Sequence, residues 1–216
     1  MERGHLFPQR DFDNRAAAEF ALRSLVRPQD LLITRFNSDP AVVGRTLQAV
    51  AESRGSDPAA TLMNLIAQSQ QTGGDEEVIA QSMLADDVAK LIAWPHANIC
   101  SDGALSDSHP RGAGAFTRVL RLYVRERGVL TLDEAIRRMT SAAATHAGIS
   151  ERGVIRPGAY ADLVLFDPER VSDRATLEHP TALSVGIDKV WVNGSIVYAG
   201  GGATAVHSGR PIRRAP

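Results

Sequence analysis

The chain has 216 residues, of which 44% are hydrophobic, with 18 glycines and 11 prolines, a composition that excludes fibrous and disordered proteins. Its 24 basic and 25 acidic side chains give a formal net charge of -1, so we expect neither a nucleic acid nor a membrane as partner. The N-terminal residues lack the apolar core of a secretory signal, and no stretch reaches the length of a membrane span, which predicts a cytoplasmic location.

In the first half of the chain, the predicted helices and strands alternate. Apolar residues at helical spacing, with proline or capping residues at the ends, predict four helices: 13–27, 43–54, 57–70 and 85–94. Short apolar runs bounded by turn residues predict three strands: 30–36, 78–83 and 97–102. This alternation favours parallel strands buried on both faces, as in an α/β barrel or a doubly wound sheet.

The second half changes from helices to strands. Helices are predicted over 117–127 and 131–149, the second with a Thr131–Glu134 capping box and with Gly148 marking its end. Strands follow at the apolar runs 162–166, 190–192 and 196–198. Asn193-Gly194 separates the last two runs, which predicts a β-hairpin.

Two stretches of this second half are similar to a known family. The run "LDEAIRRMTSAAATHAGI" followed by "RGVIRPGAYADLVLFDP" resembles the amidohydrolase superfamily, on the residues Arg152-Gly153, Pro157-Gly158 and Ala161-Asp162-Leu163. The stretch "SDGALSDSHPRGAGAFTRVLRLYVRERG" resembles the N-acyl-D-amino-acid deacylases, or D-aminoacylases, within that superfamily. The likeness covers most of the chain from Asp30 onward and is strongest from Ile99 to about Gly200.

The resemblance implies an α/β fold: the C-terminal part of a metal-dependent hydrolase (β/α)8 barrel, followed by strands of a small β-sandwich. We therefore expect three segments: an N-terminal helical segment 1–29, a partial TIM barrel 30–150, and a β-sandwich portion with the tail 151–216. A complete barrel takes about 250 residues. The chain is thus expected to be either a half that a partner chain completes or a truncated reading frame.

Asp102 ends the predicted strand 97–102. The resemblance implies that Asp102 is the general base and touches a metal-bound water, because amide hydrolysis needs an activated water and a carboxylate that moves its proton. Active-site residues of α/β barrels gather at such strand ends. From the residues alone, an aspartate before glycine is also common turn chemistry, and that interpretation stays open.

The resemblance assigns four further residues to the substrate. Arg111 is expected to grip the substrate carboxylate with its planar guanidinium, and His109 to orient the arginine loop. Met83 is expected to line the side-chain pocket, and Ser38 to lie near the substrate. The alternatives are a surface arginine, a solvated histidine and a methionine of the core.

The metal site is the part of the resemblance that the sequence does not complete. The family implies zinc held by a His-x-His, a cysteine and two single histidines, yet the six histidines include no His-x-His. Cys100 lies two residues from Asp102 and is expected to be a small buried residue.

Three hypotheses therefore remain for the function. The first is a zinc-dependent deacylase, whose substrates would be small molecules, the N-acyl-D-amino acids. The second is a catalytically silent remnant, and the third is a cyclic-amide hydrolase of the same superfamily. For the isolated chain we predict negligible zinc affinity and negligible turnover.

Overall fold

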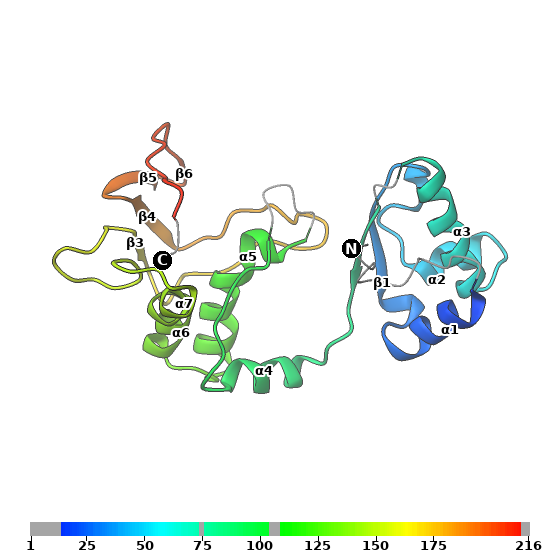
Figure 1. The fold of residues 1–216 in the computed structure, drawn as a ribbon, viewed down its shortest axis with the longest axis horizontal. Coiled ribbons are helices and arrows are strands. Elements are labelled where there is room, and N and C mark those ends of the chain that lie inside the picture. Colours follow the sequence, from blue (N-terminus) through cyan, green and yellow to red (C-terminus); the bar gives the residue numbers. More distant parts are fainter. Residues whose placement is uncertain (1–13, 74–75, 104–108, 213–216) are drawn as a thin grey trace, which may run out of the picture. The chain divides into compact units, whose positions relative to one another are not determined.

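The computed structural model describes residues 14–73, 76–103 and 109–212 (Figure 1). Its Cα positions cluster into two compact units, Met1–Met83 and Leu84–Pro216. Helices and strands occur in both units, in agreement with the expected α/β composition. The boundary between the units falls within residues 30–150, for which the sequence predicts one partial barrel, and the three-part division stays a prediction. Residues 1–13 of the predicted N-terminal segment lie outside the described part.

The first unit packs three helices against a two-stranded sheet. Its elements are α1 (Arg15–Ser24), η1 (Pro28–Asp30), β1 (Leu31–Phe36), η2 (Pro40–Val42), α2 (Leu47–Ser53), α3 (Pro58–Gln71) and β2 (Glu76–Ala80). The three α-helices begin at the polar caps Asn14, Thr46 and Asp57, whose side chains accept a backbone N–H of the first turn. The helices predicted over 13–27 and 43–54 are thus confirmed with shorter bounds, and the helix predicted over 57–70 is confirmed with a shift of one residue.

One face of β1 forms the core of this unit. Leu31, Ile33 and Phe36 are buried and pack with Leu47 and Val50 of α2, which are fully buried. β1 pairs with β2 in the antiparallel sense, with Ile33 opposite Val78. The predicted parallel pairing is therefore wrong for these strands. Parallel strands are expected to be covered on both faces of the sheet, whereas Val78 of β2 is 49% exposed.

The second unit contains a helical part and a four-stranded sheet (Figure 1). Its elements are α4 (Ala85–Ala93), α5 (Arg111–Arg118), the π-helical η3 (Val119–Glu126), α6 (Leu132–Met139), α7 (Ser141–Ala147), β3 (Leu163–Phe166), β4 (Ile187–Val192), β5 (Ser195–Ala199) and β6 (Gly202–Ala203). The sheet has the order β3-β4-β5-β6, and all its pairs are antiparallel. The predicted hairpin is confirmed, because Asn193 and Gly194 join β4 to β5 with φ of 50° and 82°.

The predicted helix 131–149 is two helices. Its start is confirmed, since the Thr131 hydroxyl accepts the Glu134 backbone N–H, and so is its end at Gly148, which has a left-handed φ of 68°. Thr140, with φ -129° and ψ -92°, separates α6 from α7. The backbone of Gly153 lies so close to that of Thr140 that a Cβ would not fit between them. A long-range contact thus accompanies a break that local sequence does not predict.

The predicted strand 97–102 is absent from the structure: residues 97–102 follow α4 and Pro95 as an irregular segment. Its Ile99 amide donates to the carbonyl of Arg138 in α6, at 3.4 Å. This segment is therefore held by the end of a helix rather than by a neighbouring strand. An apolar run of this length specifies burial or extension, but not the partner of its backbone.

Two of the residues that carry the family resemblance, Arg152 and Asp162, contact the β4–β5 hairpin of this unit. Arg152 forms an ion pair with Asp162, whose second carboxylate oxygen accepts the backbone N–H of Asn193 at 2.8 Å. The Arg152 guanidinium also lies 4.1 Å above the ring of Tyr160. These contacts connect the loop after α7 to the β4–β5 turn. Throughout the described ranges, no helix combines the length and the apolar composition needed to cross a membrane.

Candidate functional site

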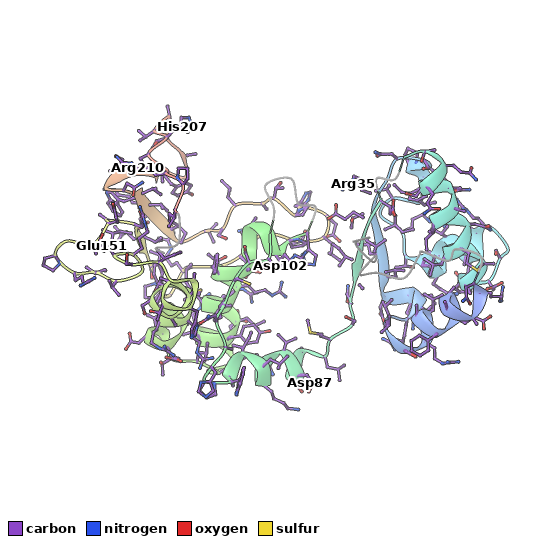
Figure 2. The ribbon with its side chains drawn as sticks, viewed as in Figure 1. Arg35, Asp87, Asp102, Glu151, His207 and Arg210 are labelled. Atoms are coloured by element: carbon purple, nitrogen blue, oxygen red, sulfur yellow. The ribbon has the colours of Figure 1, made fainter. Side chains whose placement is uncertain are left out.

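Asp102 lies in the irregular segment after α4, beside α5 (Figure 2). Its φ of 49° is in the left-handed region, which aspartate tolerates better than most non-glycine residues. The following amide, of Gly103, donates to the Ser101 hydroxyl at 3.3 Å. This local turn leaves the Asp102 side chain 76% exposed, so a small molecule can reach its carboxylate.

Arg111 is the first residue of α5 and forms an ion pair with Asp102. Its Nη1 lies 2.9 Å from Asp102 Oδ2, and its side chain is 45% exposed. The backbone N–H of Arg111 donates to Nδ1 of His109 at 3.1 Å. Of the five residues predicted for the site, the structure thus brings Asp102, Arg111 and His109 together.

A close contact between two glycine backbones lies beside this pair. A Cβ on Gly103 would overlap the Cα of Gly112, so the two backbones are in direct contact. This contact places the residue before Gly103 next to the residue before Gly112, which are Asp102 and Arg111. Gly112 is not among the residues predicted for the site, although the spaced glycines of "RGAG" are the kind of signal that marks a close backbone approach.

The helix that carries Arg111 is anchored to the rest of the unit. Gly114 of α5 is buried against Asp173 and Ala175. A Cβ added to Gly114 would lie 3.3 Å from the Cβ atom of each of these residues. Asp173 is 7% exposed and accepts a hydrogen bond from Nε of Arg121 at 2.6 Å. This bond raises the pKa of Arg121 above its ordinary value. The start of α5 is therefore fixed to a packed, charge-paired part of the fold.

The other predicted site residues belong to the first unit. Ser38 is hydrogen-bonded to the hydroxyl of Thr72 at 2.5 Å, and Met83 is 70% exposed. The alternative of Met83 as a core residue is therefore wrong for this structure, while the substrate roles of Ser38 and Met83 stay predictions. Cys100 is exposed, which corrects the expectation that it is buried: the segment 97–102 is not an inner strand.

Metal ligation is a separate question from the ion pair. Across residues 14–73, 76–103 and 109–212, no three His, Cys, Asp or Glu side chains lie close enough to hold a metal ion. Zinc sites in proteins take three or four such ligands. The described residues therefore do not fit a zinc site, and Asp102 could supply at most one ligand.

A guanidinium and a carboxylate side by side can bind a small acid and move a proton. The planar fork of Arg111 can donate two parallel hydrogen bonds to a carboxylate, which fixes a ligand in position and in orientation. Such a ligand would compete with Asp102 for the guanidinium. Asp102 can accept a proton from a water or a ligand held there.

Comparison with known proteins shows which family this chain is similar to. The family model described as "Amidohydrolase family" matches residues 4–198. The chain is 40% identical over 171 residues to the N-acyl-D-aspartate deacylase of Alcaligenes xylosoxydans xylosoxydans, a match that covers 78% of this chain and 33% of that protein.

Solved structures give the same result. The crystal structure of a D-aminoacylase is similar with a TM-score of 0.76 and 34% identity, over 92% of this chain and 45% of the other. The N-acyl-D-glutamate deacylase of Bordetella bronchiseptica, solved with zinc and a phosphonate inhibitor, is similar with a TM-score of 0.74 and 38% identity, over 86% and 37%. The chain thus spans less than half the length of these relatives. It belongs to the amidohydrolase family.

Proposed function

We propose that this chain is the substrate-binding and proton-transferring part of a hydrolase that cleaves the amide bond of N-acyl-D-amino acids. The products are a carboxylate and a D-amino acid. The observation that carries the proposal is the 2.9 Å ion pair between Asp102 and Arg111 in a chain 40% identical to an N-acyl-D-aspartate deacylase. The pair is exposed to solvent, as a site for a small polar substrate requires.

Arg111 binds the α-carboxylate of the substrate. A bidentate guanidinium–carboxylate pair orients the α-carbon as well as holding it, so the two enantiomers present their acylated nitrogen in different directions. His109 keeps the Arg111 backbone in place through the hydrogen bond at 3.1 Å. This arrangement supports selectivity for one enantiomer.

Asp102 is the general base. Its carboxylate takes a proton from the water that attacks the amide carbon and passes it to the leaving nitrogen. The zinc of the deacylase from Bordetella bronchiseptica belongs to that structure. Since the described residues do not fit a zinc site, we assign Asp102 and Arg111 only roles that need no metal contact.

The larger architecture is also part of the proposal. Residues 30–150 would be the last part of a TIM barrel and residues 151–216 a portion of a β-sandwich, in a cytoplasmic enzyme. A second polypeptide would supply the part of the relatives that this chain does not match, which is more than half of their length. The second candidate function is a catalytically silent member of the family, which the absence of a three-ligand group among the described residues favours.

A reconstitution experiment separates the two candidates. Hydrolysis of the D- and L-enantiomers of N-acetyl-aspartate, N-acetyl-glutamate and N-acetyl-leucine is measured together with bound zinc. The samples are the chain alone and the chain mixed with the unmatched part of the N-acyl-D-aspartate deacylase. We expect negligible zinc and turnover for the chain alone, and D-selective turnover for the mixture.

The variants make the result specific. Asp102→Asn should abolish the turnover of the mixture, and Asp188→Asn, a change at an exposed carboxylate of β4, should leave it unchanged. A mixture that assembles but neither binds nor hydrolyses N-acyl-D-amino acids would establish the silent candidate instead. D-selective turnover disproves the silent candidate, whether it is found in the mixture or, with stoichiometric zinc, in the chain alone.

A further inference from the structure

Arg138 carries a buried charge on the inner side of α6. The residue is only 3% exposed, and its Nη1 donates to the carbonyls of Ile92 and Trp94, at 2.6 Å each. Its Nε donates to the carboxylate of Glu134 at 2.6 Å. A buried guanidinium is tolerated only with such partners, so its position is tightly determined.

The backbone of Arg138 also contacts the segment that follows α4. Residues 94–102, here called the connecting segment, run from the end of α4 to Asp102. The Arg138 side chain holds the first carbonyl of this segment, that of Trp94, and the Arg138 carbonyl accepts the N–H of Ile99. A hydrogen bond of 2.5 Å between Asn98 and His146 of α7 adds a third contact.

We propose that Arg138 is a positioning residue for the Asp102–Arg111 pair. By holding the connecting segment at Trp94 and at Ile99, it limits where Asp102, three residues after Ile99, can place its carboxylate. The inference rests on the proposed function only in that this pair is taken to bind and convert the substrate.

Arg137 is the natural control for this role. It lies next to Arg138 in α6 and also bonds to Glu134, through Nε at 2.7 Å and Nη2 at 2.8 Å. Its side chain is 49% exposed, and these bonds lie within α6. A variant at Arg137 therefore removes a charge and a Glu134 contact from the same helix without removing the hold on Trp94.

The test follows the side-chain Nε–H signal of Arg111 by NMR in the isotope-labelled 216-residue chain, with Asp102→Asn defining the signal of the broken pair. In Arg138→Met we expect the Arg111 signal to move at least halfway to that position. Hydrogen exchange of the Ile99 amide should rise roughly tenfold or more as its acceptor loosens. Arg137→Met should change neither readout. Arg138→Lys should recover part of both, because an ammonium can donate to the same two carbonyls.

Signals of the β4–β5 hairpin show whether each variant is folded. If Arg138→Met does not fold, Glu134→Gln replaces it in the test, because Glu134→Gln weakens the acceptor that orients the Arg138 Nε. Arg137→Met is then the reference variant. An Arg111 signal that stays at the unsubstituted position in the folded variant disproves the positioning role, whatever the change in stability.

Neither NMR readout needs turnover. In the reconstituted enzyme, kcat/KM should fall roughly 10- to 100-fold in Arg138→Met, since misplacement of a catalytic group by about 1 Å has that effect. Arg138→Lys should recover part of that loss. If the unsubstituted mixture is inactive, the deacylase proposal fails, while the NMR result still decides the role of Arg138.

Discussion

Gly103 lies directly against Gly112, and this contact between two backbones sets Asp102 beside Arg111. Neither glycine carries a functional group, yet a side chain on Gly103 would occupy the position of the Gly112 Cα. The ion pair at the candidate site therefore depends on the absence of a side chain at Gly103 as much as on the presence of two charges.

Gly103→Ala should separate Asp102 from Arg111. Its methyl group forces the two backbones apart, so we expect the Arg111 NMR signal to shift toward that of Asp102→Asn. Affinity for N-acyl-D-amino acids should rise roughly tenfold, because Asp102 no longer competes with the ligand carboxylate for the guanidinium. Calorimetric titration with N-acetyl-D-glutamate measures the affinity. Gly209→Ala is the control, because nothing lies within 4 Å of the Cβ it would add. Equal affinities in the two variants would show that the glycine contact does not matter.

Arg111→Lys tests whether the fork geometry or only the charge binds the ligand. A lysine keeps the positive charge but offers a point donor, so we expect affinity for the D-enantiomer to fall roughly tenfold and discrimination between enantiomers to be lost. Binding of both enantiomers of N-acetyl-glutamate is compared. Arg156→Lys, at an exposed arginine in a loop, should change nothing. Retained discrimination in Arg111→Lys contradicts the bidentate role.

Glu134 should contribute stability that depends on pH. Hydrogen bonds from Arg137 and Arg138 lower the pKa of Glu134 from its ordinary value of 4.5 to about 2. In the unfolded chain the pKa returns to that ordinary value, so the contribution is complete above about pH 4.5 and is lost as the pH falls toward about 2.

Urea unfolding at several pH values measures this contribution. Glu134→Gln should be less stable than the unsubstituted chain at neutral pH, and the difference should narrow between about pH 4.5 and pH 2. Glu169→Gln, at an exposed carboxylate, is the control variant. A difference for Glu134→Gln that stays constant with pH would mean that the ionised carboxylate adds no stability.

Asp173→Asn should destabilise the second unit. The Asp173 carboxylate is 7% exposed and pairs with Arg121 at 2.6 Å, and Arg118 lies 3.7 Å away. Asparagine removes the charged partner of the Arg121 Nε, while Arg121 keeps its pair with Glu126, so we expect the free energy of unfolding to fall by about 2 kcal/mol. Denaturant unfolding measures the change. Asp188→Asn, at an exposed position in β4, should stay within about 0.5 kcal/mol of the unsubstituted chain.

Elements that depend on neighbouring residues follow from the sequence. The β4–β5 hairpin was predicted because Asn193 and Gly194 adopt positive φ at little cost, and the start of α6 because Thr131 can accept a backbone N–H. The family could also be identified, since the short runs "SDG" and "HPRG" resemble motifs of the family. None of these needs information about distant contacts.

Features that depend on distant residues did not follow from the sequence. The run 97–102 is apolar enough for a strand, but its Ile99 amide finds an acceptor on α6. The α6–α7 break at Thr140 coincides with the close approach of Gly153, and β1 pairs antiparallel with a strand 40 residues away that lies half open to solvent. Backbone partners across such separations are chosen by packing, which periodicity does not encode.

The candidate site divides along the same line. The sequence alone pointed to Asp102 and Arg111 as the proposed site residues, because both lie in motifs that resemble the family. Only the tertiary structure decided that Asp102 and Arg111 meet, since their contact requires the Gly103–Gly112 approach and a connecting segment held by the buried Arg138. These are contacts between elements far apart along the chain, and they form only when the elements pack.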